Sequence, residues 1–134
     1  MIKRTYPQSR LRRTRAKGYL RDLVAENHLS TNDLIQPIFI ADQQEMKIDI
    51  PSMPGIYRHN LESLYAETEE LIKQGIKSVA IFPAIDSDKK DAQGSHAFDD
   101  KNIVCSALRG LAERFPEVIK IADVALDPYT DHGH

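Results

Sequence analysis

The chain has 134 residues, of which 41% are hydrophobic and 28% charged, and its formal net charge is −2. These values are typical of one soluble globular domain with a modest core. So small a charge gives no reason to expect a nucleic-acid or anionic-membrane partner, and no apolar run is long enough to span a membrane. No secretory signal is evident, and the single Cys105 excludes an internal disulfide framework. We therefore expect a cytoplasmic protein.

Residues 1–32 are predicted to form a basic arm. Between Lys3 and Arg21 all charged side chains are basic, and the first acidic residue is Asp22. A weak amphipathic pattern over residues 19–24 predicts one short helix within the arm. The arm is either solvated or directed at a partner. Few aromatic residues are available to stack on bases, so contact with another protein subunit is a better hypothesis than nucleic-acid binding.

Three short apolar segments predict β-strands. Each is bounded by polar or turn-forming residues and is too short for a typical helix. Pro37 places the first strand near a sheet edge or at the strand's own start. The last two segments are continuous apolar runs, which is typical of strands buried on both faces. The predicted strands cover residues 34–40, 78–85 and 118–126.

Two segments between these strands repeat apolar residues at steps of three and four, which predicts helices over residues 61–74 and 102–115. Asn60 is placed to cap the first helix, and Gly75 supplies the left-handed residue common after a helix. Pro116 ends the second helix. The stretch from 41 to 60 is interrupted by proline and glycine and is expected to be irregular.

The order strand, helix, strand, helix, strand predicts an α/β fold built from parallel βαβ units. Over residues 33–134 these units could begin a doubly wound sheet or a (β/α)8 TIM barrel. A barrel has eight units and typically ~250 residues, so this chain would supply the first three units of an incomplete barrel. In both folds the functional residues gather at the carboxyl ends of the strands.

The final stretch, "ADVALDPYTDHGH", holds the candidate site. Asp123 lies within the third predicted strand, where a carboxylate needs a cation, a polar cavity or a structural hydrogen-bonding role. In an ideal strand Asp123, Ala125 and Asp127 share one side. Two carboxylates at the end of a strand are candidates for proton transfer or for binding a substrate ammonium.

Asp131 is a third candidate carboxylate. Together with His132 and His134 it could bind Mg²⁺, Mn²⁺ or Zn²⁺. Loop histidines of this kind are more often hydrogen-bonded structural residues. The chain has no glycine-rich phosphate loop, no Gly-x-Ser-x-Gly turn and no nucleophilic Cys–His pair.

Several ordered segments resemble the first two-fifths of the porphobilinogen synthase (5-aminolevulinate dehydratase) family. The match to the family's active-site segment is "DVALDPYTDHGH". Further matches occur in the arm, at the first two strands and in the unit after them: "RLRRTRAKGYLRDLVAEN", "DLIQPIFI", "IPSMPGIYR", "IFPAID" and "GSHAFDDKNIVCSALRGLAERFPE".

The resemblance implies a TIM barrel preceded by an extended N-terminal arm that wraps a neighbouring subunit, usually in a homo-octamer. It also implies an enzyme that condenses two molecules of 5-aminolevulinate into porphobilinogen with loss of two waters, in tetrapyrrole (heme) biosynthesis. The family's two Schiff-base lysines lie on later strands. Lys77 and Lys120 do not match them. The 134-residue chain alone is therefore expected to be inactive and prone to aggregate.

Residue by residue, Asp123 matches an active-site aspartate of the family. Ala125 and Asp127 stand where zinc-dependent members carry cysteines, and the third such cysteine would fall just past His134. The resemblance therefore implies no catalytic zinc and the branch commonly stimulated by Mg²⁺, with the Mg²⁺ ligands outside this chain. The hypothesised role of Asp123 and Asp127 is to hold and orient the ammonium of a substrate.

Two alternatives to an enzyme stay open from the residues alone. One is a non-enzymatic α/β module, either receiver-like or metal-binding, that uses the terminal acids. A phosphoacceptor domain would carry its acidic pair after the first strand, where this chain has only Asp42. The other is an assembly module whose role is to exchange the arm between subunits.

Overall fold

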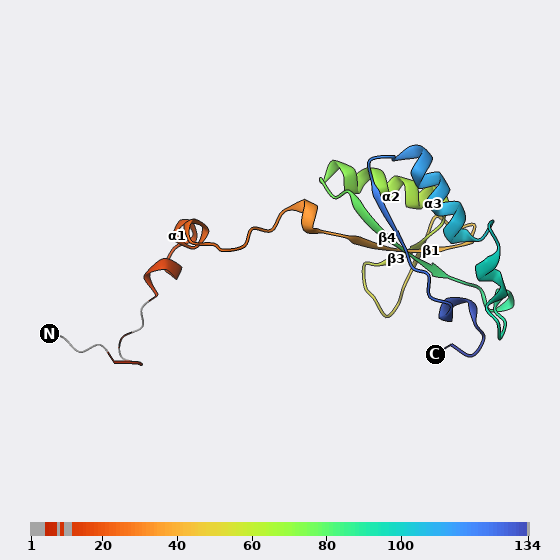
Figure 1. Cartoon of the computed structure of the whole chain (residues 1–134), viewed down its shortest axis with the longest axis horizontal. Helices are drawn as coiled ribbons and strands as arrows, with labels where there is room; N and C mark the ends of the chain where they lie inside the picture. Colours follow the sequence, from red (N-terminus) through yellow and green to blue (C-terminus); the bar gives the residue numbers. More distant parts are fainter. Residues whose placement is uncertain (1–4, 8, 10–11, 134) are drawn as a thin grey trace. The chain divides into compact units, whose positions relative to one another are not determined.

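The computed structural model describes residues 5–7, 9 and 12–133 (Figure 1). The chain divides into two compact units, Met1–Ser30 and Thr31–His134. The sequence-based prediction places this boundary after residue 32. Lys3, Arg4 and Arg10 of the predicted arm lie outside the described residues, as does His134.

The first unit is formed by short helical turns. A 3-10 turn covers Arg13–Arg15, and helix α1 covers Gly18–Leu23, close to the short helix predicted over 19–24. Neither element buries a residue, because six residues cannot form an apolar face without a partner. The Arg21 guanidinium donates to the Arg15 carbonyl at 3.1 Å and ties the two turns together.

The second unit is built on a five-stranded sheet with the order β2-β3-β1-β4-β5. All neighbouring strands are parallel except β2 and β3, which are antiparallel. The protein therefore has an α/β fold with a mostly parallel sheet. The strands cover Gln36–Ala41 (β1), Lys47–Asp49 (β2), Tyr57–His59 (β3), Ser78–Ala84 (β4) and Ile119–Ala122 (β5).

One prediction about the first half of this sheet is wrong, and another is confirmed in one of its two alternatives. The stretch from 41 to 60 is not irregular throughout, because β2 and β3 form a hairpin there, closed by Ile50 N donating to Ile56 O at 3.1 Å. Of the two alternatives predicted for Pro37, a sheet edge or the start of a strand, the structure shows the second, because the strand with Pro37 is not at an edge. It is β1, between β3 and β4, and Pro37 lies at its second position, outside the two residues that pair with β3.

The strand predicted over 118–126 ends four residues early. Strand β5 pairs with β4 only as far as Ala122, and residues 123–126 are outside the strand. The reason is local. The Asp123 carboxylate accepts a hydrogen bond from Ala125 N at 3.0 Å, and this turn replaces the extended ladder.

Helices α2 (Leu61–Lys73) and α3 (Ile103–Arg114) lie together on one face of the sheet (Figure 1). Asn60 and Asn102 cap them through side-chain oxygens that accept from backbone N–H groups, each at 2.9 Å. The core is formed by alternate residues of the central strands, the inner faces of both helices and the residue before β5: Ile38, Ile40, Val79, Ile81, Leu64, Leu71, Val104, Ala107, Leu111 and Val118.

The opposite face of the sheet carries the other half of the alternation. The rings of Phe39 and Phe82 lie 5.9 Å apart between their centroids. On strand β5, Ile119 and Ile121 are 60% and 39% exposed. Within the second unit, therefore, only one face of the sheet is packed against helices. Among the described helices, none is both long and apolar enough to span a membrane.

Candidate functional site

Acidic residues follow three parallel strands at one edge of the sheet. Asp42 comes directly after β1, Asp86 follows β4 by two residues, and Asp123 comes directly after β5. Since parallel strands end at the same edge, their following loops converge there. The carboxyl edge therefore gathers the candidate acids.

Asp123 is half-buried and fixed by its own backbone. Its N–H donates to the Ile81 carbonyl of β4 at 3.3 Å, which extends the parallel pairing by one step. One carboxylate oxygen accepts from Ala125 N. The hydrogen-bonding role considered for Asp123 is thus present, and the second carboxylate oxygen is not used in that turn.

Asp127 does not continue a strand from Asp123. It is the first residue of a 3-10 turn, Asp127–Tyr129, and its carbonyl accepts from both the backbone and the hydroxyl of Thr130. The argument from strand alternation is therefore wrong, because the chain between the two aspartates turns. Both carboxylates still lie in the segment that follows the carboxyl end of β5, and both are half-buried.

The long loop after β4 holds this segment in place. The Asp91 carboxylate accepts from Gln93 N at 3.0 Å and Ser95 N at 2.9 Å, and these bonds lower its pKa. The backbone of Asp91 pairs with Tyr129 O at 3.3 Å and with Asp131 N at 3.2 Å. Asp91 thus both shapes the loop and links it to the acidic segment.

The predicted metal-binding residues are used structurally as far as the chain is described. Asp131 is exposed, and the ring nitrogens of His132 lie 3.0 Å from Gly133 O and 3.4 Å from Ala92 O. His134 lies outside the described residues. Within residues 5–7, 9 and 12–133, no group of three or more His, Cys, Asp or Glu side chains could hold a metal ion.

A pocket of about 240 Å³ opens beside Asp123. It is mostly apolar, and Tyr129 and Cys105 also line it. Burial raises the pKa of the Tyr129 hydroxyl, and the negative charges of Cys105, when ionised, and Asp123 raise it further. Tyr129 therefore stays neutral at neutral pH, in the same pocket as the Asp123 carboxylate.

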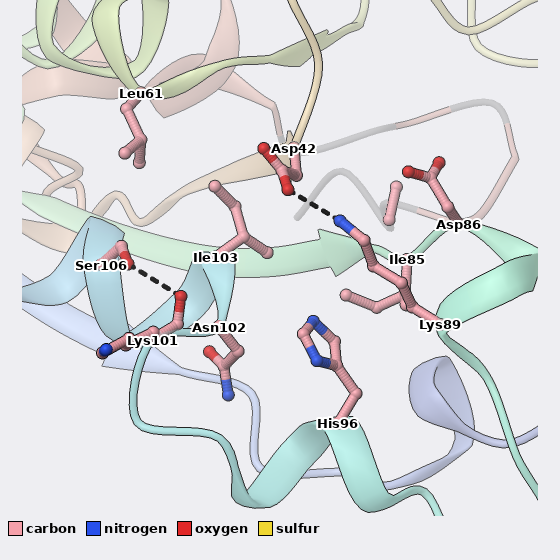
Figure 2. A pocket seen from close by; sticks show the side chains of 11 residues that line it. Asp42, Leu61, Ile85, Asp86, Lys89, His96, Lys101, Asn102, Ile103 and Ser106 are labelled. Carbon is pink, nitrogen blue, oxygen red and sulfur yellow. Dashed lines mark hydrogen bonds and ion pairs between the residues drawn. The ribbon is translucent and has the colours of Figure 1, made fainter.

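A second pocket, of about 140 Å³, lies behind the ends of β1 and β4 (Figure 2). The Lys89 ammonium meets the Asp42 carboxylate at 2.7 Å there, and this ion pair raises the pKa of Lys89. Figure 2 shows the His96 ring rising into the same space from the turn Ser95–Phe98. The pair joins the loop after β1 to the loop after β4.

A third pocket, of about 380 Å³, is formed by the ends of β1 and β4, strands β2 and β3, and the last loop. Arg58, Asp86 and Lys90 supply its charged groups, and Pro128 brings it next to Asp127. Sequence reasoning missed Arg58, Lys90 and Tyr129. The only sequence signal for these three residues was that each lies in or near a segment at the carboxyl ends of the parallel strands.

Together these features define an α/β protein with an acidic, loop-built site at the carboxyl edge of a mostly parallel sheet. The sequence model of the family described as delta-aminolevulinic acid dehydratase matches residues 8–134. The chain therefore belongs to the delta-aminolevulinic acid dehydratase family.

Individual relatives agree. The chain is 46% identical over 125 residues to the delta-aminolevulinic acid dehydratase of Chlamydia pneumoniae, covering 93% of this chain and 38% of the relative. It is 44% identical over 126 residues to that of Helicobacter pylori, with the same two coverages.

A crystal structure of porphobilinogen synthase from Toxoplasma gondii, in complex with the reaction product porphobilinogen, matches with a TM-score of 0.87 and 39% identity. The match covers 95% of this chain and 36% of that structure. The chain thus spans less than two-fifths of the length of each of these three relatives.

Proposed function

We propose that this chain forms one wall of a porphobilinogen synthase active site. The reaction joins two 5-aminolevulinate molecules, forms one C–C and one C–N bond, and releases two waters. The observation that carries the proposal is Asp123, held by β4 at the carboxyl edge of the sheet, in a chain similar along nearly its whole length to an enzyme with bound porphobilinogen.

Asp123 is proposed to hold the ammonium of one substrate and to take a proton from it. Its free carboxylate oxygen can accept from the ammonium while the other oxygen stays fixed by Ala125 N. Asp127, in the following turn, is proposed to orient the same group from the other side. A fixed carboxylate can stabilise a developing ammonium without reorganising.

The lysines of this chain at the strands are poorly placed for Schiff-base chemistry. Lys77 precedes β4 and is at the amino edge. Lys120 pairs in register with the buried Val79, and its ammonium donates to the Phe115 carbonyl at 2.6 Å on the helix side. We therefore propose that the lysines that form Schiff bases with the keto groups come from sequence beyond these 134 residues.

The wider architecture is part of the same proposal. The sheet is proposed to begin a (β/α)8 barrel, with its bare face turned to the barrel interior. The basic N-terminal unit is proposed to act as an arm on a neighbouring subunit of a cytoplasmic homo-octamer. Any Mg²⁺ is proposed to bind outside the described residues, which offer no complete set of ligands, and zinc is not required.

Borohydride trapping with 5-aminolevulinate, followed by intact mass, tests the proposal. It compares this chain with a form extended to the length of its relatives. An adduct on the extended form alone supports the division between an acidic wall and lysines elsewhere. An adduct on the 134-residue chain would mean that one of its own lysines reacts, and the proposed division would be wrong.

The role of Asp127 has its own test. Asp127→Ala in the extended, active form should lower turnover or raise the KM for 5-aminolevulinate. The matched control is Asp49→Ala, which removes a carboxylate from the exposed strand β2. Unchanged kinetics for Asp127→Ala would remove Asp127 from the mechanism.

A further inference from the structure

Backbone–backbone hydrogen bonds join the segment after β5 to earlier elements at two places in the part of the chain that the structure describes. The first is the bond from Asp123 N to the Ile81 carbonyl, which continues the pairing with β4. The second is made by Asp91, in the loop after β4, with the residues that follow Asp127. Asp127 therefore lies between one attachment to a strand and one attachment to a loop.

The attachment to the loop is a short parallel bridge. Asp91 N donates to Tyr129 O at 3.3 Å, and Asp91 O accepts from Asp131 N at 3.2 Å. The turn before this bridge is closed by its own bond, from Thr130 N to Asp127 O at 3.3 Å. Because a single closed turn separates Asp127 from the bridge, a shift of the loop at Asp91 is passed on to Asp127.

The Asp91 carboxylate keeps the loop in the shape that forms this bridge. It accepts from Gln93 N at 3.0 Å and from Ser95 N at 2.9 Å. Between these two donors Gly94 is buried and has a left-handed backbone, with a φ of 63°. A Cβ built at Gly94 would lie 3.5 Å from the Thr130 methyl group, so the loop runs close to the turn here as well as at the bridge.

We propose that Asp91 is a positioning residue for Asp127. The Asp91 carboxylate shapes the loop, the loop backbone holds the turn after Asp127, and the turn sets where the Asp127 carboxylate lies. Asp123 is held by β4 instead, so its position should not depend on Asp91. The effect on catalysis rests on the proposed function, whereas the structural link between the two residues rests on the hydrogen bonds.

A double-mutant cycle on the extended, active form tests the effect on catalysis, with kcat and KM for 5-aminolevulinate measured for each variant. The variants are Asp91→Ala, Asp127→Ala and the two combined. Asp91→Asn keeps an oxygen that can accept from both backbone N–H groups. Asp99→Ala is the matched control: the Asp99 carboxylate accepts from Lys101 N at 2.9 Å in the same loop, and no hydrogen bond joins Asp99 to the described residues after β5.

We expect Asp91→Ala to lower kcat/KM by about tenfold to a hundredfold, the scale of loss for a displaced group at a reacting centre. Asp127→Ala should remove the same contribution, so the combined variant should be no slower than Asp127→Ala alone. Asp91→Asn should recover most of the loss, and Asp99→Ala should react as the parent does. Effects of Asp91→Ala and Asp127→Ala that multiply, or unchanged kinetics in Asp91→Ala, would overturn the proposal.

Amide hydrogen exchange on the same proteins separates this inference from the proposed function. In Asp91→Ala the N–H of Asp131 should exchange faster, while the N–H of Asp123 should exchange as in the parent. Unchanged exchange at Asp131 would overturn the link whatever the kinetics show. If no form turns over 5-aminolevulinate, the proposed function is wrong, and the exchange pattern alone decides whether Asp91 holds the turn.

The amides of β1 and β4 show in the same experiment whether each variant is folded. If Asp91→Ala does not fold, Gly94→Ala takes its place, because an alanine at a φ of 63° strains the same loop and leaves the Asp91 carboxylate intact. The expected results are the same: faster exchange at Asp131, and a combined variant with Asp127→Ala that is no slower than Asp127→Ala alone. Multiplying effects would again count against the proposal.

Discussion

Gly110 of α3 provides the sharpest test of how the two helices pack on the sheet. A Cβ built at Gly110 would lie 2.6 Å from Tyr65 Cζ and 3.0 Å from Tyr65 Cε1, with the hydroxyl oxygen nearer still. Side-chain atoms do not approach this closely. Helices α2 and α3 therefore meet at a point where only glycine leaves room for the Tyr65 ring.

The expected effect of Gly110→Ala is the sum of two opposing contributions. Alanine in a helix interior is favoured over glycine by about 0.5–1 kcal/mol. Overpacking at a fixed contact typically costs about 1–3 kcal/mol. The Arg114 guanidinium lies over the ring at 4.3 Å from the centroid, so a shift of the ring would also disturb this cation–π contact. The net prediction is a destabilisation of about 1 kcal/mol, and of at most about 2.5 kcal/mol.

Urea unfolding followed by circular dichroism measures this change, at two protein concentrations so that self-association is detected. In the Tyr65→Leu background the clash is absent, and Gly110→Ala should instead stabilise by about 0.5–1 kcal/mol. Ala112→Gly, on the exposed side of α3, measures the propensity term separately. A stabilising Gly110→Ala in the parent chain, or the same cost in both backgrounds, would refute the packing argument.

Three other predictions concern the sheet and its loops. Ser63→Ala should lower the free energy of unfolding by about 1–3 kcal/mol, because buried His59 loses its partner. Burial and the charge of Lys47 lower the pKa of His59 from 6.5. As the pH falls, the histidine of the unfolded state is therefore protonated first, which favours unfolding. The urea concentration at the midpoint of unfolding should fall as the pH drops below about 6.5. Asp91→Ala should release the loop after β4, seen as faster proteolytic cleavage between residues 85 and 102 while the core amides remain protected. Ile119→Lys should reduce self-association of the 134-residue chain, measured by light scattering, because Ile119 is exposed on edge strand β5. Ile48 lies on the other edge strand and is 37% exposed, so Ile48→Lys should have less effect.

The central elements were predictable because their sequences carry long, consistent patterns. Helices α2 and α3 each have three or more turns of apolar periodicity and an asparagine cap. Strand β4 is a continuous apolar run between them. For both helices the residue propensities, the apolar periodicity and the caps agree. The structure places both helices and β4 within a residue or two of the predicted ranges.

The β2–β3 hairpin was not predictable by the same reasoning. A strand of three residues contains too few positions to show alternation, and Lys47–Asp49 is exposed along its length. The pairing of β2 with β3 depends on the turn between Ile50 and Ile56, and the position of β3 depends on its pairing with the edge of β1 that β4 does not occupy. The early end of β5 was missed for a similar reason, because the hydrogen bond from Ala125 N to Asp123 outweighs an apolar run.

In the candidate site, the acidic residues were predictable from the sequence and the basic residues were not. Acidic residues directly after a strand can be predicted as site residues from the sequence, because functional groups gather at the carboxyl ends of parallel strands. Arg58 could not be found in this way, because its face depends on the register of β3 against β1. The sequence alone could not assign different roles to the adjacent Lys89 and Lys90. In the structure Lys89 pairs with Asp42, whereas Lys90 lines the other pocket.

The loop after β4 links these two kinds of residue physically. Through Asp91 its backbone fixes the turn that contains Asp127, and through Lys90 it contributes a charge to the pocket beside that turn. A change in the loop should therefore move an acid and a cation together.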